Sequence, residues 1–150
     1  RIMPNINATV LEAMSAYCCS ESVTDDQKEF ANKLCSSFGK VMPLSESYFP
    51  LFCSIAGCAP AYAYMFIDSL ARSAVKNGMN KSVALEIAAQ TVLGSAKKIL
   101  ESDEHPWELI DKVCSPGGTT IEGIVSLQKD GFESAVCNAV DAALQKDKKV

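Results

Sequence analysis

Apolar side chains recur every three or four residues along most of the second half of the chain, which is the spacing of one face of an α-helix. The longest such segment begins after Asn80, a typical N-cap residue, and extends to about Ser102. Another begins near Phe132 and ends in a tail rich in lysine. A short helix reaching Val113 starts at Pro106, because proline suits the first helical position. The pattern therefore predicts a mainly helical second half.

The middle of the chain carries no charged side chain from Ser47 to Ile67. About 20 apolar residues are enough to span a bilayer. Pro50 and Pro60 interrupt this stretch, however, and it continues into charged residues at four-residue steps, Asp68, Arg72 and Lys76. We therefore interpret it as a helix of a soluble protein. Its apolar face is so wide that the first half is expected to be buried on all sides, as in an interlocked dimer.

The first part of the chain predicts a crossover unit of a parallel sheet. Met14–Cys18 and Lys40–Leu44 have the character of strands. Between them, Thr24 and Gln27 form a capping box that opens a helix to about Phe38, and Gly39 ends it. One such unit cannot bury both faces of its sheet, so more sheet is expected before Arg1. No G-x-G-x-x-G sequence occurs in the 150 residues.

Composition and charge exclude several classes of function. The net charge is -4, with mixed signs and no basic stripe, so neither nucleic acid nor an anionic membrane is an expected partner. The seven cysteines are an odd, scattered set, which favours free, mostly buried thiols in a reducing cytoplasm. Cys53 and Cys58 have a spacing that zinc sites use, but no second ligand pair accompanies them, so no metal is expected.

The segment from Ser115 to Thr120 is the strongest candidate for binding chemistry. Gly117 and Gly118 remove side chains that would keep a ligand from the backbone, and Thr119 with Glu122 has the spacing of a capping box. Free amides and the helix dipole at such a turn favour a carboxylate or a phosphate. A Gly-rich connector with an ordinary cap is the alternative explanation.

The ionisable residues nearby do not suggest acid–base catalysis. His105 is the only histidine and stands where a helix cap is expected, which argues against a catalytic triad. Asp103 and Glu104 lie in an acidic loop with no evident partner to shift the pKa of either carboxyl, so we expect them to be solvated surface groups.

The run from His105 to Cys114 that leads into this turn, with Ile121, Gly123, Leu127 and Gly131-Phe132 after it, resembles the signature of pyrroline-5-carboxylate reductase. Further blocks resemble the same family in the same order: Arg1–Asn5, Glu12–Ser15, Gly57–Tyr62 and Ala88–Gly94. The resemblance covers essentially all 150 residues.

The resemblance implies a mostly α fold. A C-terminal helical dimerisation domain, like that of 6-phosphogluconate dehydrogenase, would follow a residual βαβ unit of a Rossmann-type sheet. Residues 1–47 would be the end of the dinucleotide-binding domain, and residues 48–150 the helical dimerisation and substrate-binding domain. The chain would then be a fragment without the nucleotide-binding half, and inactive alone.

The activity implied by the resemblance is reduction of 1-pyrroline-5-carboxylate to L-proline by NADPH or NADH, in the cytoplasm. NADPH is the favoured cofactor, although the residue that reads the ribose would lie upstream. Few ionisable groups are needed, because the cofactor supplies the hydride. The implied assembly is a homodimer or a higher oligomer, with the family's pocket formed between one subunit's nucleotide-binding half and the other subunit's helices.

The resemblance also implies roles for individual residues. The substrate carboxylate would be held by the turn, and the Thr120 hydroxyl would bond to the ring nitrogen as the catalytic group. Met3, Pro4 and Asn5 would meet the nicotinamide end of the cofactor. The full substrate-binding set is Val113, Ser115, Gly117, Gly118, Thr119 and Thr120.

Several positions depart from the family pattern: Ile6, Asn7, Ala13, Pro50, Cys58 and Ala59. Side chains where the family has glycine restrict the backbone and the approach of a ligand. These departures leave two alternatives open, a non-catalytic homodimerising helical module and a divergent dehydrogenase that acts on another imine or on a hydroxy acid.

Overall fold

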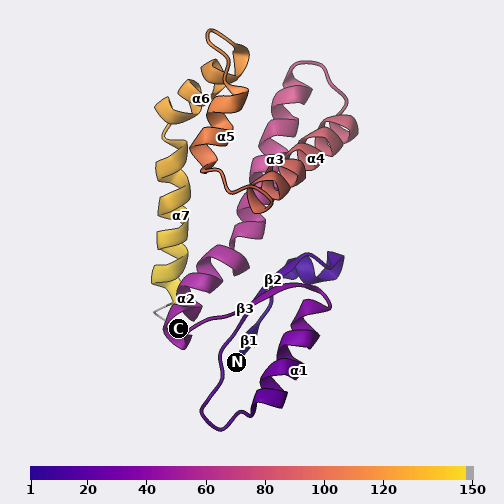
Figure 1. Cartoon of the computed structure of the whole chain (residues 1–150). Helices are drawn as coiled ribbons and strands as arrows, with labels where there is room; N and C mark the ends of the chain where they lie inside the picture. The colour runs from indigo at the N-terminus through magenta and orange to yellow at the C-terminus, as the bar shows by residue number, and fades with distance from the viewer. Residues whose placement is uncertain (148–150) are drawn as a thin grey trace. The chain divides into compact units, whose positions relative to one another are not determined.

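The computed structural model describes residues 1–147 (Figure 1). It divides into two compact units, one made of Arg1–Tyr62 with the segment from Asn138 onward, and the other of Ala63–Cys137. Helix α3 (Ala59–Lys76) and helix α7 (Phe132–Asp147) each begin in one unit and end in the other. Each unit is described separately below.

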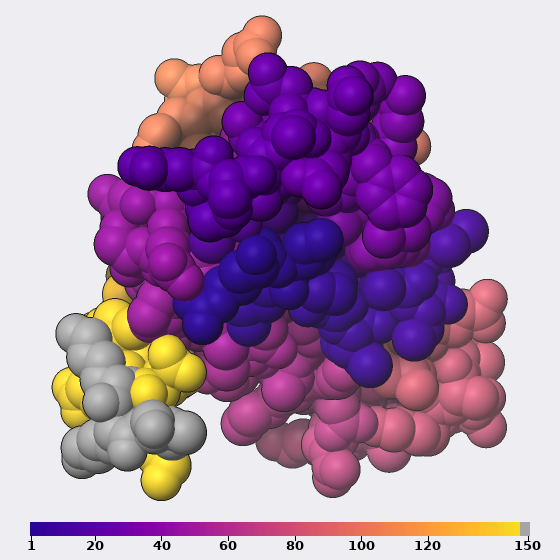
Figure 2. Space-filling model, turned by 90° about the horizontal axis from the view of Figure 1, so that it is seen from below, coloured from indigo at the N-terminus to yellow at the C-terminus, as the bar shows by residue number. Residues whose placement is uncertain are grey.

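The first unit contains a three-stranded sheet in the order β1-β2-β3, formed by β1 (Ile2–Met3), β2 (Ala13–Tyr17) and β3 (Gly39–Pro43). Strands β2 and β3 are parallel and are connected through α1 (Asp25–Ser36), which confirms the predicted crossover unit. Strand β1 pairs antiparallel with β2, which the sequence did not reveal because the strand has only two residues. The N-terminal residues, indigo in Figure 2, are open to solvent on the face shown.

Local sequence explains the boundaries of α1 and β3. The Thr24 side chain accepts a hydrogen bond from the Gln27 amide, and the Gln27 side chain accepts one from the Thr24 amide, so the predicted capping box is present. The helix ends at Ser36, and Gly39 opens β3 with φ +151°. Ala13 and Ala16 of β2 and Cys35 of α1 are buried in this unit.

Gly39 is the position in this sheet where a side chain is least tolerable. A Cβ atom there would lie 2.2 Å from the Ala13 carbonyl oxygen and 2.3 Å from its nitrogen, in a backbone conformation that L-residues rarely adopt. We expect Gly39→Ala to lower the free energy of unfolding by about 3 kcal/mol, because β3 must shift away from β2. Urea denaturation measures this loss. Gly94→Ala, where a Cβ meets nothing within 4 Å, is the control, and an equal effect of both changes would contradict the prediction.

After β3 the chain runs through several short helical turns into α3. These are the 3-10 turn η2 (Glu46–Tyr48), the four-residue helix α2 (Phe49–Phe52) and the π-helical turn η3 (Cys53–Gly57). In η3 the Cys58 amide donates to the Cys53 carbonyl at 3.0 Å, the five-residue spacing of a π-helix. Another 3-10 turn, η1 (Ile6–Val10), lies between β1 and β2.

The second unit contains the rest of α3 with α4 (Lys81–Leu100), α5 (Pro106–Val113), α6 (Thr119–Lys129) and the start of α7. Gly78, at φ +95°, ends α3, and the Asn80 side chain caps α4 by accepting from the Ser82 amide, as predicted. Ala71, Ala84 and Ala88 form the buried contact between the two helices. Asp68 pairs with Lys81 and Arg72, and these partners hold the pKa of its carboxyl below the usual range.

The first half of α3 was expected to be buried on all sides, but Tyr64 and Met65 are exposed in the single chain. Among the described residues, one helical run is long and apolar enough to cross a membrane, Glu46–Lys76, with mean hydropathy 1.4. Length and composition alone are weak evidence for a membrane-spanning helix. Because Pro50, the π-helical turn and Pro60 all fall in its first half, the run is also irregular there.

The thiols are less buried than the sequence suggested. All seven cysteines are free, but Cys19 and Cys137 are exposed and only Cys35 is fully buried, where burial raises the pKa of its thiol. The prediction assumed that a cysteine among apolar residues is buried. It fails because a helix with few neighbours leaves apolar positions open to solvent. Among residues 1–147, no three His, Cys, Asp or Glu side chains gather as a metal site.

Candidate functional site

Helix α5 leads into the predicted binding turn and is held at its start by two reciprocal bonds. The His105 Nδ1 atom accepts from the Trp107 amide at 3.2 Å, and the Glu108 carboxylate accepts from the His105 amide at 3.2 Å. His105 is therefore the helix cap, as expected. Glu104 does have a partner, contrary to expectation: its ion pair with Lys112 lowers the pKa of the Glu104 carboxyl. This contact could not be read from the sequence, because its partners are eight residues apart.

Both glycines of the turn between α5 and α6 stand where a side chain would disturb the turn as it is. Gly117 has φ +66°, a left-handed conformation that favours glycine. Gly118 donates its amide to the Ser115 carbonyl at 2.9 Å, and a Cβ atom on Gly118 would lie 2.3 Å from the Ser115 Oγ atom. The Ser115 hydroxyl therefore lies directly over Gly118, in space that only a glycine leaves open.

The predicted capping box at Thr119 is wrong. Gly118 is the N-cap of α6, with no side-chain cap, and Thr119 is already the first helical residue. The reason is the tight bond from Gly118 to Ser115, which lets the helix begin one residue earlier than the Thr119–Glu122 spacing indicated. The first amides of a helix have no intrahelical partner, so those of Thr119 and Thr120 can bind a ligand.

The turn is accessible to solvent. Ser115, Gly117, Thr119 and Thr120 are exposed, and Gly118 is half-buried. Val113, at the end of α5, is 65% exposed. The residues that carry these amides and hydroxyl groups at the positive end of α6 are thus open to solvent, which suits the binding of a small carboxylate.

The second predicted site segment, Met3–Asn5, joins β1 to η1. Met3 pairs with Ala16 in the sheet, and Asn5 is the N-cap of η1. The Asn5 side chain accepts from the amides of Asn7 and Met14, at 3.3 Å each, and donates to the Ala56 carbonyl at 3.0 Å. This last bond joins the segment to the π-helical turn. The sequence alone did not suggest it, since the partners are 51 residues apart.

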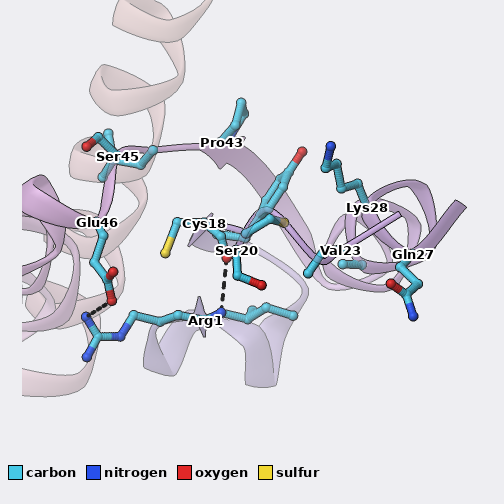
Figure 3. A pocket seen from close by; sticks show the side chains of 14 residues that line it. Arg1, Cys18, Ser20, Val23, Gln27, Lys28, Pro43, Ser45 and Glu46 are labelled. Carbon is cyan, nitrogen blue, oxygen red and sulfur yellow. Dashed lines mark hydrogen bonds and ion pairs between the residues drawn. The ribbon is translucent and has the colours of Figure 1, made fainter. Parts of the chain in front are cut away.

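A cavity of about 890 Å³ lies elsewhere, beside the residues that follow β2 and β3 (Figure 3). Arg1 crosses it, with its amino group 3.0 Å from the Cys18 carbonyl oxygen and its guanidinium 3.2 Å from Glu46. Lys28, also in the wall, is paired with Asp25. None of the predicted site residues lines this cavity and its cations are already paired, so the turn before α6 remains the better candidate.

Comparison with known proteins decides the family. A family model described as pyrroline-5-carboxylate reductase dimerisation matches residues 46–150, which include the π-helical turn and the whole Ser115–Thr120 turn. The chain belongs to the pyrroline-5-carboxylate reductase family. The mostly α fold implied by the sequence resemblance is likewise confirmed.

Relatives in this family match the whole chain. A pyrroline-5-carboxylate reductase of Synechocystis is 40% identical over 150 residues, which are all of this chain and 56% of the relative. The chain thus spans little more than half of that relative. The solved 1-pyrroline-5-carboxylate reductase of Streptococcus pyogenes superposes with a TM-score of 0.95 at 42% identity, over 100% of this chain and 58% of the other.

A second solved pyrroline carboxylate reductase, from Plasmodium falciparum with NADP bound, has a TM-score of 0.93 at 36% identity, over 99% of this chain and 60% of the other. The pyrroline-5-carboxylate reductase fold is thus reproduced across distant organisms.

Proposed function

We propose that this chain is the dimerisation and substrate-binding part of a reductase that converts 1-pyrroline-5-carboxylate to L-proline with NAD(P)H. The observation that carries the proposal is the exposed Ser115–Thr120 turn, which presents amides and hydroxyls at the start of α6 inside the matched family region. Residues 1–47 would complete a nucleotide-binding domain, and residues 48–150 would form the helical domain.

Each group of the turn has a role in the proposed reaction. The amides of Thr119 and Thr120, with the Ser115 hydroxyl and the open backbone at Gly117 and Gly118, hold the substrate carboxylate. The Thr120 hydroxyl bonds to the ring nitrogen and orients the imine, and Val113 shields one side of the ring. Orientation and charge stabilisation are the protein's contributions to such a step.

The cofactor supplies the hydride when it is bound. Because no dinucleotide fingerprint occurs in the 150 residues, this chain would hold only the nicotinamide end, through the segment Met3–Asn5. NADPH is our choice of cofactor, supported by the NADP bound in the Plasmodium falciparum relative. A cytoplasmic homodimer, or a higher oligomer built from it, is the proposed assembly.

The proposal is tested with the full-length protein, by following NADPH oxidation and proline formation from 1-pyrroline-5-carboxylate. We expect turnover that depends on both substrates. Pyruvate as substrate tests the alternative of a dehydrogenase that acts on a hydroxy acid. Gel filtration tests the alternative of a non-catalytic module that only dimerises. Reduction of pyruvate in place of the imine, or a stable dimer that turns over neither compound, would overturn the proposed activity.

A further inference from the structure

The Ala56 carbonyl, in the π-helical turn η3 just before α3, lacks its usual helical donor. In an α-helix it would accept from the amide of residue 60, four positions on. With the five-residue spacing of a π-helix it would accept from the Ala61 amide, which instead donates to the Cys58 carbonyl at 3.1 Å. Residue 60 is proline, which has no amide hydrogen. A half-buried backbone carbonyl without a partner is costly, so another donor is expected there.

The Asn5 side chain supplies that donor. Its Nδ2 atom lies 3.0 Å from the Ala56 carbonyl oxygen. Its Oδ1 atom meanwhile accepts from the amides of Asn7 in η1 and Met14 in β2. A single side chain thus joins η1, β2 and the π-helical turn η3, and three of its four hydrogen-bonding positions are used within the protein.

We infer that Asn5 is a positioning residue, whose side-chain amide fixes the Met3–Asn5 segment on the carbonyl that Pro60 leaves without a helical donor. The inference rests on the proposed function, in which this segment meets the nicotinamide. It assigns to Asn5 the task of holding Met3 and Pro4 in place, and leaves contact with the cofactor to those two residues. The π-helical turn becomes the anchor of the segment.

Asparagine is suited to this task because it combines a donor and an acceptor in one rigid amide. Aspartate has the same shape and can still accept from Asn7 and Met14, but it has no hydrogen for Ala56. It would place a carboxylate oxygen against a carbonyl oxygen. The segment must then move away from η3, while β1 and β2 can keep their pairing.

The first test is Asn5→Asp in the full-length reductase, with Asn7→Asp as the matched control. Asn7 engages Asn5 through its backbone amide, so the control makes the same chemical change and keeps that bond. We expect kcat to fall about 10- to 100-fold in Asn5→Asp, as for a displacement near 1 Å, with the Kd for NADPH changed by less than about 3-fold. Asn7→Asp should keep kcat within about 2-fold.

The second test uses Pro60→Ala, which restores an amide hydrogen opposite Ala56. We expect Asn5→Ala to shift the urea midpoint of unfolding about half as far in the Pro60→Ala background as in the native one. This cycle measures the bond without any assay of activity. If the full-length protein reduces no imine, the proposed function fails while the cycle still decides whether Asn5 and Ala56 are coupled.

Three results would overturn the inference. One is equal kcat in Asn5→Asp and Asn7→Asp. Another is a rise in the Kd for NADPH with kcat preserved, which would make Asn5 a direct cofactor contact. The third is a shift of the urea midpoint by Asn5→Ala that is equal in the native and the Pro60→Ala backgrounds.

Discussion

Thr120→Val is expected to lower kcat for 1-pyrroline-5-carboxylate by about 10²- to 10³-fold, the usual loss when a positioned hydrogen-bond group is removed from an active site. Valine has nearly the same shape as threonine but no hydroxyl. In the proposed reaction that hydroxyl meets the ring nitrogen, whose charge and geometry change as the hydride arrives. The loss should therefore appear in kcat more than in KM. Steady-state kinetics of the full-length protein measure both constants.

Ser126→Ala is the matched control for this change. Ser126 lies on the same helix, α6, and the substitution also removes one hydroxyl. We expect its kcat to stay within about 2-fold of the native value, because surface substitutions have small effects. Normal turnover by Thr120→Val would exclude the assigned hydroxyl, and an equal loss in both variants would point to damage of α6 as a whole.

Gly118→Ala is expected to raise KM by at least about 10-fold, with a smaller change in kcat. The new methyl group would lie 2.3 Å from the Ser115 hydroxyl and 3.0 Å from the Ser115 carbonyl oxygen. The hydroxyl must leave its place, and the bond from the Gly118 amide to Ser115 must lengthen. Both changes act on carboxylate binding, which contributes equally before and during the reaction.

The control for Gly118→Ala is Gly123→Ala, in the same helix, where a Cβ atom meets nothing within 4 Å. Glycine inside a helix is less favourable than alanine, so this variant should gain about 0.5–1 kcal/mol of stability and keep its KM. Product binding, followed by titration with proline, should show the same contrast. A KM for Gly118→Ala equal to that of the control would remove the turn from the substrate site.

Local signals in the sequence predicted the elements whose ends are set by their own residues. The Thr24–Gln27 capping box, Asn80, and Pro106 after His105 all stand where the structure places helix starts. The parallel pairing of β2 and β3 followed from the length of the crossover. These features depend on contacts within a few residues, which a sequence displays directly.

Features that depend on distant partners could not be predicted in this way. The π-helical turn has an ordinary apolar sequence, and its hydrogen-bonding partner, Asn5, lies 51 residues before Ala56. The start of α6 was predicted one residue too late, because the Thr119–Glu122 spacing indicated a cap at Thr119. The bond from the Gly118 amide to the Ser115 carbonyl, which is seen only in the structure, makes Gly118 the cap. The residue types of the site were visible in the sequence, whereas the position of the Ser115 hydroxyl over Gly118 depends on how the turn folds.

The contact between α3 and α4 has a thermodynamic consequence. Within the described residues 63–137, the buried apolar side chains are Ala71, Ala84 and Ala88, while Met65 and Leu100 are more than 70% exposed. Three alanines remove little hydrocarbon from water, so this part of the chain gains little free energy by closing on itself. With a second copy covering the exposed faces, as in the proposed homodimer, folding and assembly become one equilibrium governed by mass action, and the native population depends on protein concentration.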